Sequence, residues 1–149
     1  MSRLRRILHP TDFSRASGAA FKRAVAMAKA DRAQLIIAHV MTPPSLALAG
    51  EGYVPPRLYE ELEASARADA QKRLGALAAR ARKAGVRATR LVLEGVPHER
   101  MARAARSKKV DLIVIGTHGR TGLARFFLGS VAARLIARAP CPVLTVRGR

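Results

Sequence analysis

Short apolar runs alternate with longer amphipathic segments along this chain. Residues 34–40 form a compact apolar run without internal alternation, which is typical of a strand buried on both faces of a parallel sheet. Residues 110–115 form a second and stronger run that ends abruptly at Gly116. A helix-length segment follows each run, so the pattern predicts alternating strands and helices.

The same pattern places the other elements. Further strands are expected at residues 5–9, 86–93 and 142–146, and helices at about 15–30, from beyond residue 56 to about 84, at 97–107, and from 130 to Pro140. Either Asp12 or Ser14 could cap the first helix. Residues 41–56 hold four prolines and two glycines and are expected to form a long loop.

Two of these helices have a recognisable apolar face. The long helix is expected to bury one continuous stripe, formed by Leu58, Leu62, Ala66, Ala70, Leu74, Leu77 and Ala81. Gly85 suits the C-terminal end of that helix. The last helix is expected to bury Val131, Leu135 and Ile136.

The alternation ends on a fifth strand and predicts one α/β domain over residues 1–149. The expected architecture is an open, parallel, five-stranded, Rossmann-like sheet with helices on both faces. A length of 149 residues is usual for one domain. With no Trp, two Tyr and four Phe, the core should be aliphatic.

The net charge of +18 points toward anionic partners. However, the basic residues are spread along the chain, and Arg outnumbers Lys 22 to 6, as codon bias alone can produce. Few aromatic rings are available for base stacking. Specific nucleic-acid recognition is therefore not expected, whereas weak, nonspecific adhesion at low salt remains open.

The remaining composition points to the cytoplasm. The single cysteine, Cys141, cannot form an internal disulfide, and it is expected to be a small buried or edge residue. The basic N-terminus lacks the apolar region of a signal peptide. No stretch approaches the roughly 20 apolar residues of a membrane span.

Residues 116–130 form a glycine-spaced segment between a predicted strand and a predicted helix. In open parallel sheets, ligands bind beyond the carboxyl ends of strands. Glycines there allow positive φ and close approach of a phosphate, and Gly129-Ser130 would supply helix N-terminal N–H groups. The spacing matches neither the P-loop nor Gly-x-Gly-x-x-Gly. On spacing alone, a turn that merely joins a strand to a helix is the alternative.

The spacing Gly116-x2-Gly119-x9-Gly129-Ser130 resembles the ATP-binding signature of the universal stress protein family. Residues 7–14, 94–97 and 140–146 also resemble segments of that family, in the same order. The resemblance implies an adenine nucleotide alpha hydrolase-like fold with strand order 3-2-1-4-5. It also implies a homodimer that pairs through the last strand, which holds Val143, Leu144, Thr145 and Val146.

The resemblance also implies roles for individual residues. Pro10 and Val40 would lie against adenine. Ribose and phosphates would contact a larger set: Thr11, Asp12, Gly116, Gly119, Gly129, Ser130 and Val131. The loop residues Thr117, His118 and Arg120 are further candidates, although His118 could be an exposed histidine and Arg120, like Arg125, could be solvated. Asp12 could instead cap a helix, or it could hold Mg²⁺ carried by the nucleotide.

The resulting hypothesis is a regulatory stress-response protein that binds ATP, ADP or AMP with slow or no turnover. A binding protein is favoured over an enzyme because the glycine-rich loop holds no Glu or Gln to orient a water. A slow ATPase or self-phosphorylating enzyme, with Asp12 as metal ligand, is the first alternative. A basic scaffold that associates with nucleic acid without a nucleotide is the second.

Overall fold

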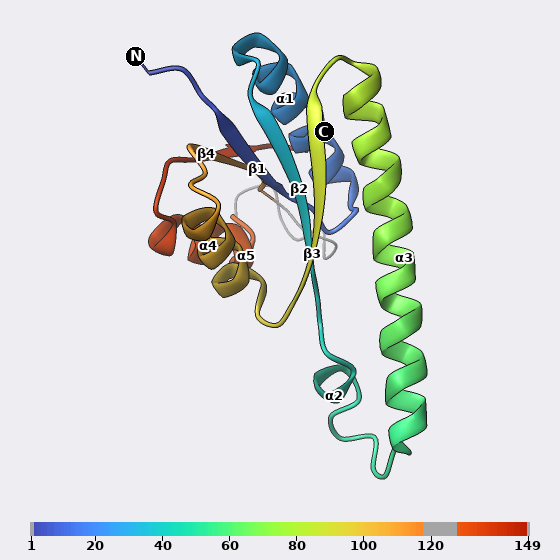
Figure 1. Cartoon of the computed structure of the whole chain (residues 1–149). Helices are drawn as coiled ribbons and strands as arrows, with labels where there is room; N and C mark the ends of the chain where they lie inside the picture. Colours follow the sequence, from blue (N-terminus) through green and yellow to red (C-terminus); the bar gives the residue numbers. More distant parts are fainter. Residues whose placement is uncertain (1, 118–127, 149) are drawn as a thin grey trace.

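A computed structural model describes residues 2–117 and 128–148 and shows a five-stranded parallel sheet with helices on both faces (Figure 1). The strand order is β3-β2-β1-β4-β5, which confirms the expected fold class and strand order. The elements are β1 (Arg6–Pro10), α1 (Arg15–Asp31), β2 (Gln34–Met41), α2 (Pro44–Ala47), α3 (Pro56–Lys83), β3 (Arg87–Glu94), α4 (Pro97–Ser107), β4 (Leu112–Gly116), α5 (Ser130–Arg138) and β5 (Val143–Val146).

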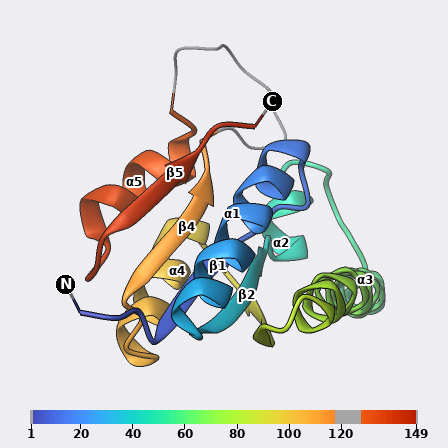
Figure 2. The ribbon, with the colours of Figure 1, turned by 90° about the horizontal axis from the view of Figure 1, so that it is seen from above.

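Two apolar cores sandwich the sheet, and Figure 2 shows the helices that cover each face. Successive residues of β1 alternate between these cores, because neighbouring side chains of a strand point to opposite faces. Ile7 packs beneath α1 and α3, whereas Leu8 packs beneath α4 and α5. No helix in the described ranges is both long and apolar enough to cross a membrane.

The turn from β1 into α1 is held by two short side chains. The Ser14 hydroxyl accepts a hydrogen bond from Ser17 N at 3.2 Å and is the N-cap of α1. Asp12 Oδ1 accepts from Ser14 N at 2.9 Å, so its carboxylate stabilises the turn that precedes the cap. Of the two candidates, the cap is therefore Ser14.

Helix α3 extends well beyond the sheet, which makes part of its expected buried stripe wrong. Leu58 and Leu62 are 42% and 41% exposed, and the buried positions begin only at Ala70. A helix of 28 residues is about 42 Å long, whereas a strand of eight residues spans about 26 Å. The N-terminal half of α3 therefore has no sheet to pack against (Figure 1).

Three smaller expectations also need correction. The region expected to be a long loop contains the one-turn helix α2, and β2 continues into it as far as Met41. Ile136 is 47% exposed, and the buried residues of α5 are Ala132 and Leu135. Adjacent helical residues point about 100° apart, and Ile136 lies beyond the face of α5 that packs on the core through Ala132 and Leu135.

Candidate functional site

A pocket of about 300 Å³ opens at the carboxyl ends of β1, β2 and β4, beside the N-terminus of α5. Its lining residues are Pro10, Thr11, Asp12, Ser17, His39, Val40, Pro97, Met101, Ile115, Gly116, Thr117, Gly129, Ser130, Val131 and Ala132. After β1 the chain passes to α1 on one face, and α5, which follows β4 in the order of elements, covers the other face. The pocket therefore lies at the topological switch point, where ligands of open α/β sheets bind.

One side of the pocket is apolar. The ends of the strands contribute Pro10, Val40 and Ile115, and α4 contributes Met101. All four except Pro10 also pack in the core beneath α4 and α5, so their positions are set by the fold itself. Such a wall suits a flat, apolar group. The volume of the pocket is at the lower end of the range for small-molecule sites.

The turn after β1 forms the polar side of the pocket. Thr11 Oγ1 accepts hydrogen bonds from Phe13 N at 3.0 Å and from Ser17 Oγ at 2.7 Å. Thr11 N also donates to Ala38 O on β2 at 2.8 Å. Thr11 is thus held on three sides, and this rigid turn places the neighbouring Asp12 at the rim of the pocket.

The backbone of α1 approaches Gly116 closely. A Cβ at this position would lie 3.0 Å from Ala16 O and 3.1 Å from Ala16 C. Neither glycine uses the positive φ that glycine permits, because Gly116 does not adopt one and Gly129 has a φ of −57°. The requirement for glycine at 116 comes from contact with α1, and it persists whether or not a ligand is bound.

The N-terminus of α5 points its first backbone N–H groups toward the pocket. Ser130, Val131 and Ala132 are its first three residues, and all three line the pocket. Among the described residues no side chain caps this helix end. Gly129 N donates to Thr117 O at 2.6 Å, which holds the start of α5 beside the end of β4. The geometry is that of an anion-binding helix N-terminus with a hydroxyl beside it.

Two histidines lie near the pocket and were not among the sequence-predicted site residues. His39 lines it, its Nδ1 is 2.8 Å from Thr11 O, and its ring packs on Phe13 with centroids 4.6 Å apart. His9 is fully buried, and its Nδ1 lies 2.9 Å from Val114 O. Burial lowers the pKa of His9 to about 4, against a smaller opposing effect of the Val114 hydrogen bond and the Asp12 charge.

The structure brings nine of the sequence-predicted residues to one pocket: Pro10, Thr11, Asp12, Val40, Gly116, Thr117, Gly129, Ser130 and Val131. His118, Gly119 and Arg120 lie outside the described residues, as does Arg125. The lining residues missed from the sequence are Ser17, His39, Pro97, Met101, Ile115 and Ala132. Three of these could have been found from the sequence. His39 and Ile115 directly precede the predicted site residues Val40 and Gly116, and Pro97 opens a helix at the same edge of the sheet.

The remaining groups of chemical interest are metal-ligating side chains and the single cysteine. In residues 2–117 and 128–148, no cluster of three or more His, Cys, Asp or Glu side chains could hold a metal ion. Cys141 is partly buried and packs against the core beneath α4 and α5, as expected. Burial raises the pKa of its thiol.

Sequence comparison assigns the chain to a family. The model of the universal stress protein family matches residues 3–147. The chain belongs to the universal stress protein family. Universal stress protein MJ0531 of Methanocaldococcus jannaschii is 38% identical over 144 residues, which cover 96% of this chain and 82% of that protein. The family resemblance seen in the glycine-spaced segment is thereby confirmed.

Solved structures of this family share the fold. The structure of MJ0577, from the same organism, superposes with a TM-score of 0.86 at 27% identity and covers 99% of each chain. A universal stress protein solved in complex with cAMP gives a TM-score of 0.69 at 27% identity, covering 99% of this chain and all of that one (100%). That relative therefore binds an adenine nucleotide on a closely similar backbone.

Proposed function

We propose that this universal stress protein binds an adenine nucleotide in the pocket between β1, β2, β4 and α5. The observation that carries the proposal is one cavity with an apolar wall on one side and, on the other, a helix N-terminus that no side chain in the described ranges caps. An adenine base needs the first, and a phosphate needs the second. The relative in complex with cAMP supports the same ligand class.

Each group of lining residues has a role in this proposal. Pro10 and Val40 contact the base, while the α5 N–H groups and the hydroxyl of Ser130 donate to phosphate oxygens. Thr11 and Asp12 shape the ribose side. Each charge-assisted N–H···O bond contributes about 1.5–3 kcal/mol. After the costs of desolvation and ordering, three such bonds support roughly micromolar affinity.

ATP, ADP and AMP all carry the groups that this pocket recognises. Asp12 is the carboxylate among the described lining residues, and it would hold Mg²⁺ that accompanies a polyphosphate. Bound Mg²⁺ would neutralise charge on the phosphates.

We further propose a regulatory role with slow or no turnover. No Glu or Gln is found among the described residues that line the pocket, and residues of this kind orient the attacking water in many enzymes that hydrolyse nucleotides. We also propose that the protein acts in the cytoplasm, in the stress response, and as a homodimer. Its β5 strand lies at the edge of the sheet, where Val143, Leu144, Thr145 and Val146 offer a strand for pairing with a second copy.

Calorimetric titration with ATP, AMP, cAMP and GTP tests the proposal at about 0.15 M ionic strength, where nonspecific attraction to the basic surface is screened. Adenine nucleotides should bind with roughly micromolar Kd, and GTP at least about tenfold more weakly. The double variant Gly129→Val and Ser130→Ala should weaken ATP binding at least about tenfold, because it fills the pocket rim and removes a hydroxyl. Gly18→Ala with Ser65→Ala is the matched control, since both positions lie outside the pocket.

Two outcomes would contradict the proposal. One is the absence of adenine nucleotide binding, and the other is unchanged affinity in the Gly129→Val and Ser130→Ala protein. Loss of binding in the control variant as well would indicate an effect on folding, which circular dichroism would detect.

The presence of Asp12 at the pocket supports slow ATP hydrolysis or self-phosphorylation as a second candidate function. Incubation with ATP and Mg²⁺ over several hours decides between the two. Turnover that disappears in Asp12→Ala would establish the enzyme, and no product in the wild-type protein would exclude it.

A further inference from the structure

A second depression lies at the opposite edge of the sheet, where the strands begin. It has a volume of about 940 Å³ and is lined by Ser2, Arg3, Leu4, Arg5, Arg6, Asp31, Arg32, Gln34, Arg87, Lys109 and Asp111. We call the six cations of this set, which are Arg3, Arg5, Arg6, Arg32, Arg87 and Lys109, the basic rim. All six are exposed. We propose that the basic rim binds the phosphate backbone of duplex nucleic acid without regard to sequence.

The two carboxylates of the depression are occupied by backbone donors. Asp111 Oδ2 accepts from Arg5 N at 2.8 Å and from Arg6 N at 2.9 Å. Asp31 Oδ2 accepts from Leu4 N at 2.9 Å. These acids stabilise the entry into β1, so their geometry is set by the fold.

Three of the five guanidinium groups of the basic rim donate to neutral backbone carbonyls. Arg3 Nε donates to Asp31 O at 2.6 Å, Arg6 Nη1 to Lys108 O at 3.0 Å, and Arg87 Nη2 to Arg32 O at 3.4 Å. Within residues 2–117 and 128–148, none of the six cations forms an ion pair with a carboxylate. These bonds orient the side chains while their positive charge stays available to a ligand.

Backbone conformation adds an independent observation. Only three non-glycine residues in the described ranges have a positive φ, and two belong to the basic rim: Arg32 at 54° and Lys109 at 52°. Each follows a helix, at a position where glycine is favoured because it has no Cβ. The equivalent turn after α3 does contain a glycine, Gly85, with a φ of 91°.

The helix dipole does not account for these two side chains. Cations near a helix C-terminus interact favourably with the dipole. However, Lys29 already occupies the last turn of α1, and Arg106 that of α4, without a positive φ. Long basic side chains at 32 and 109 therefore fit a binding role better than a stabilising one.

The spacing of the basic rim suits a phosphate backbone. Arg6 pairs with Gln34, and Gln34 pairs with Arg87, so these positions form a row across β1, β2 and β3. With Lys109 before β4, the row spans four neighbouring strands, or about 15 Å. The same length of duplex DNA carries about nine phosphates. The described lining residues include no aromatic ring, which favours a duplex over a single strand bound by base stacking.

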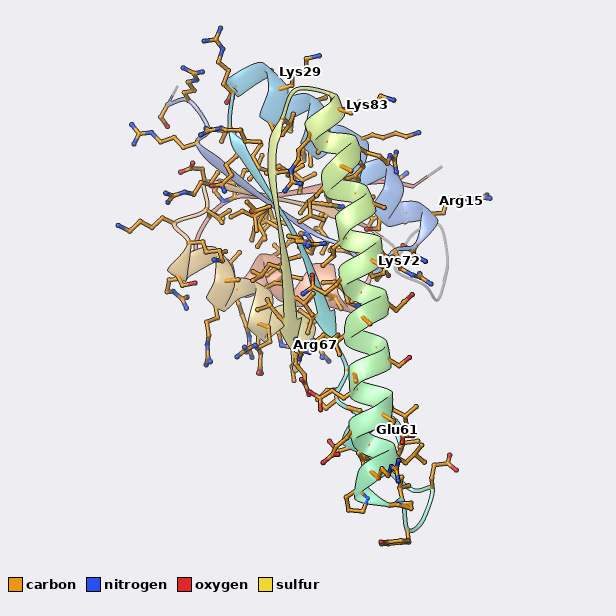
Figure 3. All side chains as sticks on the ribbon, turned by 45° about the vertical axis from the view of Figure 1, so that its right-hand side comes forward. Arg15, Lys29, Glu61, Arg67, Lys72 and Lys83 are labelled. Carbon is orange, nitrogen blue, oxygen red and sulfur yellow. The ribbon has the colours of Figure 1, made fainter. Side chains whose placement is uncertain are left out.

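The acidic part of this chain is a poor alternative occupant. Residues 51–69 hold five of the ten acidic residues, and they lie on the projecting half of α3 and the segment before it. Figure 3 shows Glu61 on that half, far from Lys29. Lys29 lies in the last turn of α1, just before Arg32 of the basic rim. Most of those carboxylates are already paired within α3, as Glu61 is with Arg57 at 3.2 Å and Asp69 with Arg73 at 3.1 Å. A second copy therefore offers the basic rim little negative charge.

Fluorescence anisotropy with a labelled DNA duplex of 20 base pairs tests the proposal. With five or six phosphate contacts, log K should fall with log salt at a slope of about −5, which is roughly a thousandfold loss between 50 and 200 mM. The double variant Arg32→Gly and Lys109→Gly should reduce the magnitude of that slope by about 2. Its thermal midpoint should stay equal or rise, because glycine adopts both conformations readily.

The control is Lys22→Ala with Lys72→Ala, which removes the same charge from exposed positions on α1 and α3. Its salt slope should stay within about 0.5 of the wild-type value, because only charges that contact phosphate release counterions. An equal loss of slope in both double variants would show that net charge alone is responsible and would overturn the proposal. A lower thermal midpoint in the glycine variant would also overturn it, since the two cations would then be structural.

Other ligands are distinguished in the same experiment. An unlabelled duplex should displace the probe, whereas a saturating adenine nucleotide should not, because its proposed pocket lies at the other edge of the sheet. Stronger competition by inorganic polyphosphate than by duplex, at equal phosphate concentration, would overturn the choice of nucleic acid. Salt-sensitive self-association without duplex binding would assign the basic rim to a second copy, and it would equally overturn the proposal.

Discussion

Replacing His9 with phenylalanine is expected to remove an acid sensitivity that burial creates at the centre of the sheet. His9 Nδ1 lies 2.9 Å from Val114 O, and a carbonyl only accepts, so Nδ1 carries the proton of the neutral ring. His9 Nε2 is buried and has no hydrogen-bond partner among the described residues. Protonating Nε2 would place a positive charge in this apolar interior, which is why the pKa falls from 6.5 to about 4.

The sign of the effect follows from the two protonation states. The unfolded chain takes up this proton near pH 6.5, but the folded protein does so only near pH 4. The unfolded state therefore binds more protons between these values, and the stability falls as the pH drops from 6.5 to 4. Between pH 7 and pH 5 the loss from His9 alone is about 2 kcal/mol. In a domain of this size, that corresponds to about 4–8 °C in Tm.

Urea unfolding of the wild-type and His9→Phe proteins at pH 7 and pH 5 measures this loss. Phenylalanine keeps an aromatic ring beside Phe21, whose ring centroid lies 5.8 Å from that of His9. The substitution also removes the hydrogen bond to Val114 O, but that cost is the same at both pH values. The wild-type protein should lose about 2 kcal/mol more than the variant between pH 7 and pH 5. Equal pH dependence in the two proteins would refute the reasoning.

Two other pairs of substitutions test the packing, each by chemical denaturation. Gly116→Ala should destabilise the fold by about 1–3 kcal/mol, because its Cβ would lie 3.0 Å from Ala16 O. In contrast, Gly18→Ala, which meets nothing within 4 Å, should stabilise by about 0.4–1 kcal/mol, and an equal effect of both would contradict the contact argument. Leu74→Ala should cost about 2–5 kcal/mol, since Leu74 is 0% exposed. Leu62→Ala, at 41% exposure, should cost less than about 1 kcal/mol, and a larger cost would mean that the projecting half of α3 is covered in solution.

The order of elements and the fold class could be predicted from the sequence because burial leaves a regular signal. Residues 34–40 and 110–115 are apolar without alternation, and only strands covered on both faces require this. Strict alternation of strands and helices then leaves few topologies, because parallel crossovers are right-handed. Local turn chemistry indicated the end of β4 and the start of α5. The nine lining residues that could be named in advance came largely from the resemblance to the universal stress protein family.

Features that depend on the distance between elements could be seen only in the folded structure. Periodicity shows which residues of α3 share a face, but not that the sheet ends before Leu62, so the exposed half of the helix could not be foreseen. It also could not show that Gly116 is required by the backbone of α1. The basic rim likewise joins residues from Arg3 to Lys109 that are distant in sequence. The elements and the glycine-spaced turn could therefore be predicted from local pattern. Which side chains meet depends on the length and position of neighbouring elements, and this was visible only after the elements had packed together.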